Sequence, residues 1–484
     1  MNLTSSNLKF FPRSLTSQDD MEFGLAQTGT GNRLAVLGDS SLPEFEGERS
    51  ELSGRTLILG ALTPKNAFAL RTHLDWLQPR PLGLATSAGL GDRLGLATPG
   101  HVRAVRTVGG KVAPVFTQQS IREMTRTGRT PQQVMDDAAW GIFAEGWQEA
   151  HGADADHLKN PADLDACLKV GYTFFTIDPG AHVENRAESA SLIELQELAA
   201  ALPDETSVKA SGLLGKSFNI EDLKITFDEA VLLKAAVKYG KAVHHVASMY
   251  RHLEQAAGPR PFEFEVSVDE TDQPTSHAEH IYIASELKRL GVKWVSLAPR
   301  YVGRFEKGVG YIGDLDVFEK DFAGHAAIAR QFGPYKLSLH SGSDKFSIYP
   351  IAARLSRRLI HLKTAGTSYL EALRTVADLD PVFFKEIYAF ARERYENDKA
   401  SYHVSAELKR APLPNAVSDW PGLLDQFDAR EILHVTFGSV LTDKTATGDW
   451  RFYDRFMDFL RANPEAYASN LEKHFIRHLK PFVI

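Results

Sequence analysis

The stretch FEFEVSVDE, residues 262–270, alternates apolar residues with residues that could take part in chemistry. Such alternation is typical of a β-strand, because successive side chains point to opposite faces. The polar face carries Glu263, Glu265 and Asp269. In a closed parallel barrel this face points inward, and residues near the end of the strand lie at the mouth, where active sites form. We therefore expect a structural or ion-paired role for Glu263 and functional roles for Glu265 and Asp269.

Other strand-like runs end in residues of similar chemistry. They are Asp156 and His157 in GADADHL, Asp178 in YTFFTID, Arg300 after KWVSLAP, His340 in YKLSLHS and Lys363 in LIHLKTAG. Carboxylates held close together in a low dielectric repel one another, and a divalent cation relieves that repulsion. Two or three carboxylates with one imidazole suit Zn²⁺, Mn²⁺, Co²⁺ or Ni²⁺. The sequence thus predicts a divalent metal ion as a cofactor.

We assign the metal ligands to Glu265, Asp269 and His340. The basic residues Arg300 and Lys363 are then left to bind an anionic group of a substrate. The alternative to a metal is an internal salt bridge, in which Glu265 or Asp269 pairs with Lys363 or Arg300.

These residues need a frame that brings the ends of separate strands together. From about residue 94, strand-like runs alternate with helical patterns, which is typical of a parallel sheet. The runs cover residues 94–99, 113–117, 152–158, 172–178, 262–269, 293–299, 335–341 and 359–366. Capping signals such as Thr130 with Gln133, and Ser276 with Glu279, mark helix starts between them. Eight strands indicate an α/β fold closed into a (β/α)8 TIM-like barrel, with an open doubly wound sheet as the alternative.

The same patterns divide the chain into three parts. Residues 1–80 form an N-terminal lead-in segment with one strand-like run at 55–62, and residues 81–366 form the catalytic barrel. Residues 367–484 are mainly helical, with one late strand-like run at 431–440, and are expected to pack on the barrel as a C-terminal extension.

Composition narrows the class of protein. The 484 residues are 43% hydrophobic and 24% charged, the balance of a globular protein, and a net charge of −7 argues against a nucleic-acid partner. Cys167 is the only cysteine, which excludes an internal disulfide and fits a reducing compartment. The first residues lack a signal-peptide core, and no segment approaches the ~20 apolar residues of a membrane span. We therefore expect a cytoplasmic protein with no membrane partner.

One glycine-rich segment invites comparison with nucleotide-binding loops. GLGDRLG, residues 89–95, has glycines near a dinucleotide-binding spacing, but it lacks the G-x-G-x-x-G pattern and precedes a strand instead of following one. No nucleotide cofactor is expected.

Long motifs past residue 80 resemble one family. They are GDRLGLATPGH (91–101), FTQQSIREMTRTGRTPQQVMDDAAWG (116–141), GADADHLK (152–159), EVSVDETDQPTSHAEH (265–280), VSLAPRYVGRFEKGVGYIGDL (295–315), LSLHSGSDKFSIYP (337–350), HLKTAGTSYLEAL (361–373) and HVTFGSVL (434–441). The sequence is similar to the tagaturonate/fructuronate epimerases, which are metal-dependent hexuronate 4-epimerases, some of them active on fructose and tagatose. The resemblance implies interconversion of D-tagaturonate and D-fructuronate with a bound divalent metal.

The chemistry of such an epimerase assigns further roles. In a 2-keto hexuronate, C4 is α neither to the ketone nor to the carboxylate, so direct removal of its proton is implausible. Retro-aldol cleavage of the C3–C4 bond or transient oxidation at C4 are the alternatives, and we favour the first because no dinucleotide fingerprint is present. Asp156 and Asp178 are the candidate acid/base residues. Arg300 and Lys363 are expected to hold the C6 carboxylate, with His157 as a third substrate-binding residue.

Two other functions fit the same residues. Lys363 at a strand end could be the Schiff-base lysine of a class I aldolase or lyase. A non-catalytic sugar-acid-binding protein is the second alternative, although a binding site alone seldom needs so many ionisable groups. In each case the partner is a small sugar acid or ketohexose, and a homo-oligomer is compatible with the sequence.

Overall fold

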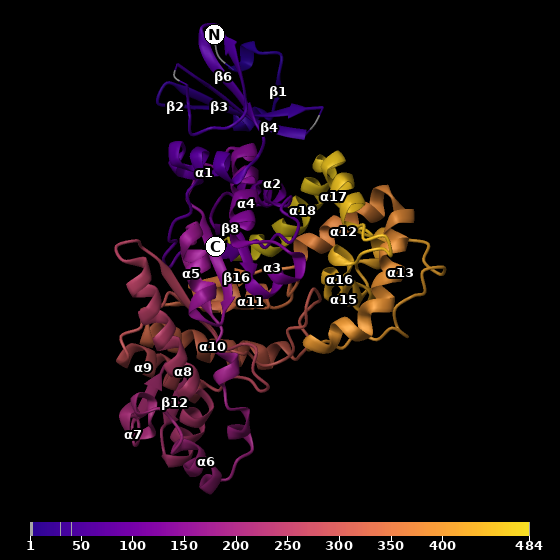
Figure 1. The fold of residues 1–484 in the computed structure, drawn as a ribbon. Coiled ribbons are helices and arrows are strands. Elements are labelled where there is room, and N and C mark those ends of the chain that lie inside the picture. The colour runs from indigo at the N-terminus through magenta and orange to yellow at the C-terminus, as the bar shows by residue number, and fades with distance from the viewer. Residues whose placement is uncertain (1–2, 30, 40, 484) are drawn as a thin grey trace.

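Eight parallel strands close into a barrel at the centre of the computed structural model, which describes residues 3–29, 31–39 and 41–483 (Figure 1). The strands are β7 (Ser87–Gly89), β8 (Ala113–Ser120), β9 (Gly152–Leu158), β10 (Phe174–Ile177), β13 (Glu263–Ser267), β14 (Ser296–Ala298), β15 (Lys336–Leu339) and β16 (Ile360–Lys363). Each pairs with its neighbour in the sequence of barrel strands, and β16 pairs with β7. The predicted (β/α)8 barrel is therefore confirmed.

The first barrel strand differs from the sequence prediction. The run at 94–99 is not a strand, since its end enters α2 (Thr98–Thr107), where Pro99 suits the first helical turn. The strand that closes the barrel is β7, made of serine, alanine and glycine. Glycine suits the end of this strand, because a Cβ on Gly89 would lie only 3.0 Å from Cγ of Gln118, whose side chain is buried.

Helices surround the barrel and follow the strands in alternation. Besides α2, which follows β7, they are α3 (Ile121–Thr127), α4 (Pro131–Glu145), α5 (Pro161–Val170), α8 (Glu229–Ala257), α9 (His277–Arg289), α10 (Leu315–Phe332), α11 (Tyr349–Ser356) and α12 (Thr367–Leu379). The capping boxes predicted at Thr130 and Ser276 are present at the starts of α4 and α9. Each satisfies backbone N–H groups that the first turn leaves free.

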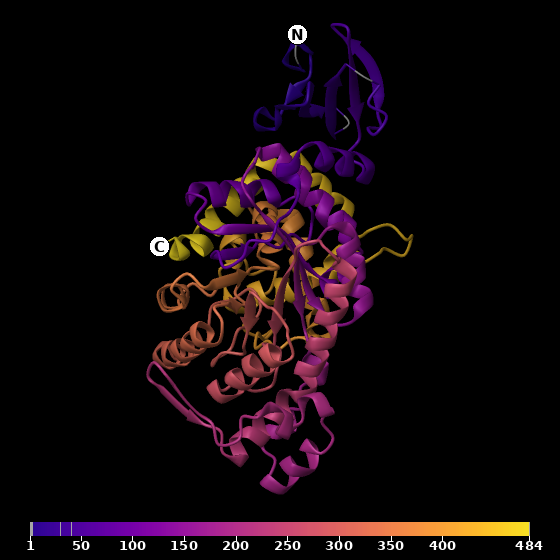
Figure 2. The ribbon, with the colours of Figure 1, turned by 90° about the vertical axis from the view of Figure 1, so that its left-hand side faces the viewer.

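An antiparallel sheet precedes the barrel. Its strands are β1 (Lys9–Phe10), β2 (Thr16–Gln18), β3 (Met21–Thr28), β4 (Gly31–Gly38), β5 (Glu48–Leu52) and β6 (Arg55–Gly60). The strand-like run predicted at 55–62 is β6, and α1 (Pro64–His73) leads from this sheet to the barrel. In both views the sheet lies at one end of the molecule (Figures 1 and 2).

A lobe of residues 179–228 lies at the opposite end of the molecule (Figure 2). It is inserted between β10 and α8 and contains α6 (Leu192–Ala199), α7 (Val208–Ser211) and a hairpin of β11 (Ser217–Ile220) and β12 (Leu223–Thr226). None of the described residues that line the two cavities at the barrel mouth belongs to this lobe.

The C-terminal region is helical, as predicted, and packs on the barrel. It contains α13 (Pro381–Asp398), α14 (Trp420–Leu423), α15 (Phe427–Val435), α16 (Phe437–Thr442), α17 (Tyr453–Ala462) and α18 (Pro464–Leu479), and α18 lies against α2. The strand predicted at 431–440 is wrong, because α15 and α16 occupy these residues. Both helices are buried on most sides, so their apolar run lacks the polar face that distinguishes a helix from a strand. Among the described residues, no helix has the length and apolar character needed to cross a bilayer.

Candidate active site

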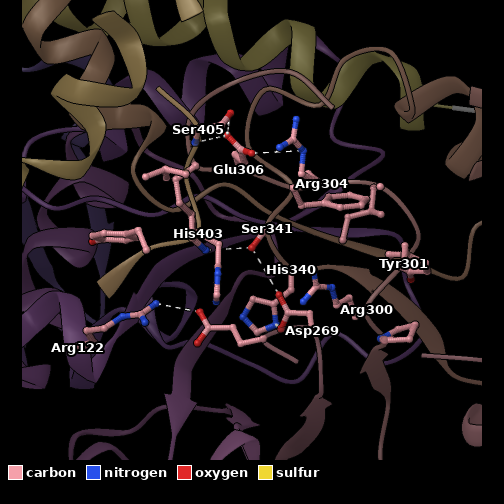
Figure 3. Close-up of a pocket in the computed structure, with 18 residues that line it drawn as sticks. Arg122, Asp269, Arg300, Tyr301, Arg304, Glu306, His340, Ser341, His403 and Ser405 are labelled. Atoms are coloured by element: carbon pink, nitrogen blue, oxygen red, sulfur yellow. Dashed lines mark hydrogen bonds and ion pairs between the residues drawn. The ribbon is translucent and has the colours of Figure 1, made fainter. Parts of the chain in front are cut away.

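A deep cavity lies at the C-terminal ends of the barrel strands. It encloses about 460 Å³ and is walled by the loops after β13, β14 and β15 and by residues 402–405 of the C-terminal region. Figure 3 shows Asp269, Arg300 and His340 together on the strand side of this cavity, with His403 and Ser405 among the residues facing it. A smaller cavity reaches deeper and shares His340 with the first. The site therefore forms where the barrel architecture leads one to expect it.

His340 is the central residue of the site, because three carboxylates surround its ring. Its Nε2 lies 3.0 Å from Oδ1 of Asp156, within hydrogen-bond distance. Its Nδ1 lies 3.6 Å from Oε1 of Glu265 and 3.6 Å from Oδ1 of Asp269, too far for a hydrogen bond to either. Nδ1 is buried and has no hydrogen-bond partner among the described residues, and the same is true of Oε2 of Glu265. A buried ring nitrogen that faces carboxylates without a hydrogen bond to them suits a cation beside it.

Lys363 lies beneath His340 and contacts three carboxylates. Its Nζ is 2.9 Å from Asp154, 2.8 Å from Asp156 and 2.8 Å from Glu265, and all four side chains are buried. One ammonium cannot neutralise three carboxylates. Burial and the neighbouring charges accordingly raise the pKa of Asp154 to about 7. Burial disfavours the charged form of Lys363, but the three carboxylates outweigh it and raise its pKa well above the usual value.

His157 reaches the site because β9 is irregular. The pairing of β9 with β10 shifts by one residue between Phe175 and Ile177, and His157 adopts a left-handed backbone conformation with φ of 53°. A bulge of this kind re-aims a side chain, so that Asp156 and His157, although adjacent, both line the smaller cavity.

Two carboxylates face the His157 ring. Its Nδ1 is 3.2 Å from Oδ2 of Asp178, and its Nε2 is 4.0 Å from Oε1 of Glu270. Burial works to lower the pKa of His157, but the charge of Asp156 and the hydrogen bond to Asp178 outweigh it and raise the pKa to about 9. Asp178 does not itself line either cavity. It orients the imidazole, whose Nε2 side faces Glu270.

Four basic side chains line the larger cavity, Arg122, Arg300, Arg304 and Lys307, and Arg304 lies 3.6 Å from Glu306. Arg300 is half-buried, and its guanidinium has no hydrogen-bond or ion-pair partner within the part of the chain that the structure describes. Lys307 lines both cavities, and its Nζ donates to Oγ of Ser341 at 3.0 Å. Arg122 pairs with Glu270 at 3.1 Å. Arg300 and Lys307 are thus the cations available to an anionic ligand.

The structure brings together most of the residues that the sequence singled out. His340 contacts Asp156, Glu265 and Asp269, and His157 contacts Asp178. Arg300 lines the larger cavity. The predicted role of Lys363 in holding substrate is not supported by its position, because the ammonium is buried and already contacts three carboxylates. The internal salt bridge of Glu265 with Lys363, weighed as an alternative, is present.

Several site residues escaped the sequence analysis. Glu270 follows Asp269 directly, one residue beyond the predicted strand, and could have been included on that ground. Lys307 lies in an irregular loop, and Tyr402 and His403 come from the C-terminal region, about 40 residues after the last barrel strand. No periodic pattern marks these positions. Glu263 lies deep in the barrel, where it accepts a hydrogen bond from the backbone of Gly83, in keeping with a structural role.

A closed parallel barrel with ionisable groups gathered at its mouth places the chain among the (β/α)8-barrel enzymes. The sequence profile of the tagaturonate epimerase family (UxaE) matches residues 11–482. The tagaturonate/fructuronate epimerase of Thermotoga maritima is 42% identical over 474 residues, covering 97% of this chain and 96% of that protein. The chain therefore belongs to the tagaturonate epimerase family and is an epimerase.

Solved structures of a relative agree with this assignment. Crystal structures of the fructuronate-tagaturonate epimerase UxaE from Cohnella laeviribosi, one native and one with glycerol, each superpose with a TM-score of 0.93 at 37% sequence identity. Each alignment covers 99% of this chain and 97% of that chain. The whole molecule, including the sheet and the C-terminal helices, thus shares the architecture of that relative.

Proposed function

We propose that this protein inverts C4 of a 2-keto hexuronate and so interconverts D-tagaturonate and D-fructuronate, with a divalent metal ion as cofactor. D-fructose and D-tagatose, which differ from these acids in lacking the C6 carboxylate, are proposed as further substrates. The observation that carries the proposal is the buried Nδ1 of His340. It has no hydrogen-bond partner in the described chain and faces two carboxylates at 3.6 Å, beside a cavity lined by cations. Family membership supports the substrate class.

The residues proposed to hold the metal are His340, Glu265 and Asp269. With Nε2–H of His340 donated to Asp156, the lone pair of Nδ1 faces the other two carboxylates. A carboxylate behind a ligating imidazole is a common arrangement, because it fixes the orientation of the ring. Zn²⁺, Mn²⁺, Co²⁺ and Ni²⁺ all suit one imidazole and two carboxylates. The neighbouring group of Asp156, His157 and His340, whose ligand atoms lie within 4.8 Å of one another, is the alternative position for the ion.

We assign the substrate carboxylate to Arg300 and Lys307. Arg300 offers a planar guanidinium with no protein partner among the described residues, and such a group binds a carboxylate through two parallel hydrogen bonds. Lys307 adds a second positive charge on the same wall of the cavity. Lys363, first assigned to this role, instead balances charge below the site.

The proton transfers fall to His157, whose neutral form is the base and becomes populated as the pH rises through its pKa of about 9, with Asp178 as the residue that positions it. Both oxygens of Asp156 are occupied, Oδ1 by Lys363 and His340 and Oδ2 by Gln118 at 3.0 Å, which makes Asp156 a poor base. Removal of the proton from the 4-hydroxyl lets the C3–C4 bond break, and the electron pair moves toward the C2 ketone. The aldehyde formed at C4 turns its other face, the bond re-forms, and the new 4-hydroxyl takes back a proton. When bound, a divalent ion would supply a Lewis acid for the ketone oxygen.

The aldolase alternative is not favoured, because a Schiff-base lysine must be neutral to attack a carbonyl. The carboxylates around Lys363 raise its pKa and hold the proton on the amine. A silent binding protein is not favoured either, since the chain belongs to a family of epimerases.

The test uses D-tagaturonate labelled with deuterium at C4, with D-fructuronate followed by NMR. We expect conversion with the label retained, loss of activity after dialysis against EDTA, and recovery with Mn²⁺ or Zn²⁺. Exchange of the label with solvent would show direct proton removal at C4, and transfer to a bound nicotinamide would show transient oxidation. Absence of conversion would refute the assigned substrate.

The remaining parts of the proposal concern the location of the protein and its binding partners. A cytoplasmic location is supported by the single cysteine, Cys167, which is buried in α5 and has no partner for a disulfide within the chain. A sugar acid is the proposed partner, and no nucleotide cofactor is invoked.

A further inference from the structure

A second group of metal-ligating side chains lies outside the barrel, between α9 and α10. His277 is the first residue of α9, and Asp321 and His325 lie one turn apart on α10. Oδ1 of Asp321 is 3.7 Å from Nε2 of His277 and 3.6 Å from Nε2 of His325. The three ligand atoms lie within 4.8 Å of one another. Residues four apart on a helix face the same way, so α10 presents both of its ligands to His277.

His325 carries an atom that the surrounding protein does not satisfy. The residue is fully buried, and its Nε2 has no hydrogen-bond partner in the described chain. Its Nδ1 lies 2.9 Å from Nδ1 of His280, whose Nε2 lies 2.8 Å from the hydroxyl of Tyr335. If Nδ1–H of His325 donates to His280, and Nε2–H of His280 donates to Tyr335, both contacts are satisfied. The lone pair of His325 Nε2 is then left to face Asp321, as in a histidine that binds a metal.

The local backbone leaves room for the third ligand. The ring of His277 lies against Gly324, where an added Cβ would be only 2.3 Å from Nε2. Among the described residues, Asp321 forms ion pairs with these two histidines and with no lysine or arginine. The side chains of His277 and Asp321 are 24% and 13% exposed, so an ion can enter from solvent.

Another cluster of possible ligands differs from this one in its charge balance. Asp344, His474 and His478 also converge, but Arg430 pairs with Asp344 at 3.1 Å. His478 Nε2 already accepts a hydrogen bond from the Asp344 backbone. Positive charge is therefore supplied by the protein in that cluster, whereas the group at α9 and α10 contains no such residue.

We propose that His277, Asp321 and His325 form a second binding site for a divalent cation of the Zn²⁺ class, distinct from the barrel mouth. Two imidazoles and a carboxylate are a common Zn²⁺ ligand set, and ligands at the usual bond lengths of a tetrahedral ion stand roughly 3.4 Å apart. The observed separations of 3.6 and 3.7 Å are close to this value. Nε2 of His277 donates to the backbone carbonyl of Asp321 at 2.9 Å, and it gives up this hydrogen bond when it binds the ion. Solvent supplies the fourth ligand.

The site has a structural consequence for the neighbouring wall of the active-site cavity. Oδ2 of Asp321 accepts a hydrogen bond from the backbone N–H of Val302 at 3.1 Å, which fixes the chain two residues after Arg300. The bound ion ties α9 to α10 and holds the Asp321 carboxylate in the orientation that this hydrogen bond requires.

The experiment measures Zn²⁺ per chain after equilibrium dialysis, using mass spectrometry of the metal and the full-length protein. The variant H277Q replaces a partly exposed ligand. D321N replaces a second ligand and keeps the oxygen that accepts from Val302. The control H252Q removes a histidine that pairs with Asp165 on the surface. We expect H277Q and D321N each to hold one Zn²⁺ fewer than the wild-type protein, whatever number the wild type holds, and H252Q to hold the same number.

Thermal unfolding provides the second measurement. Added Zn²⁺ is expected to raise the unfolding midpoint of the wild type and H252Q by several degrees more than that of H277Q. The affinity of H277Q for Zn²⁺ should be lower than that of the wild type by more than ~10–100-fold, the loss typical when only a hydrogen bond to a metal ligand is removed. Equal Zn²⁺ content in H277Q, D321N and the wild type would overturn the proposal and leave an ion-paired cluster only.

Discussion

Replacement of Lys363 by methionine tests whether its ammonium balances charge inside the barrel. At an effective dielectric of 20, one ion pair 2.8 Å apart is worth about 6 kcal/mol before desolvation is subtracted. Removing one partner of a buried pair typically costs about 3–5 kcal/mol, because the remaining charge is left uncompensated. We expect K363M to be about 3–5 kcal/mol less stable than the wild type at pH 8, since two of its three contacts are 2.8 Å long.

The pH dependence of this deficit distinguishes charge balance from packing. In the wild type, burial opposes ionisation of Glu265, but Lys363 together with His361 and His340 outweighs it and lowers the pKa to about 2. That stability is present above pH 4–5 and is lost as the pH falls toward the folded pKa. Without the ammonium, the balance shifts toward burial and the mutual repulsion of the carboxylates, which raise the pKa values of these groups. In K363M, a carboxyl whose folded-state pKa lies above 7 takes up a proton as the pH falls. Between pH 7 and 5.5 this protonation reduces the loss of unfolding free energy by about 2 kcal/mol, so the difference from the wild type becomes smaller on acidification.

The assay is urea unfolding followed by circular dichroism, on protein dialysed against EDTA, at pH 8 and pH 5.5. The matched control is K409M, at a lysine whose side chain is 80% exposed, which should change stability by no more than about 0.5 kcal/mol. A deficit of equal size at both pH values would mean that K363M acts through lost packing. A K363M protein as stable as the wild type at pH 8 would refute the reasoning.

Three further variants probe the site and its support. D178N should lower kcat roughly 100-fold with little change in KM, and should move the acid limb of the pH–rate profile to lower pH, because His157 loses a carboxylate that favours its charged form. An unchanged limb would contradict the positioning role. R300M should raise KM for the uronate about 10–100-fold, the loss of a charge-assisted hydrogen bond, while activity on D-fructose stays the same; equal losses on both would exclude recognition of the carboxylate. D344N should lower the unfolding free energy by about 3 kcal/mol, because Arg430 is left buried without its closest carboxylate, and a change under about 1 kcal/mol in chemical denaturation would contradict this account.

The sequence located most of the barrel but not all of it. Seven runs coincide with strands, because these short segments keep apolar residues at alternate positions, such as Ala153 and Ala155 in β9 and Leu337 and Leu339 in β15. The eighth strand, β7, consists of Ser87, Ala88 and Gly89, residues with little strand preference. Its place in the barrel depends on room for the side chain of Gln118, which is a tertiary requirement and leaves no periodic pattern in the sequence.

The site was predictable to a similar extent and for similar reasons. Alternation along residues 262–269 was enough to single out Glu265 and Asp269 as candidates, and strand ends pointed to His340 and Arg300. The partner of each charge was harder to assign. Lys363 pairs with Glu265 inside the barrel, where side chains from separate strands meet. The sequence does not show which of these side chains become neighbours. Loop residues such as Lys307 carry no periodic signal at all.

The contact of α18 with the loop after β15 has a consequence for protein synthesis. All eight barrel strands have been translated by residue 363, yet His474 of α18 lies 2.6 Å from Asp344 in the loop that follows β15 and His340. A nascent chain can therefore form its barrel while the ribosome still holds residues 464–479, but the loop beside His340 acquires this support only after those residues emerge. Enzymatic activity should consequently appear in a translation reaction later than protection of the barrel from protease.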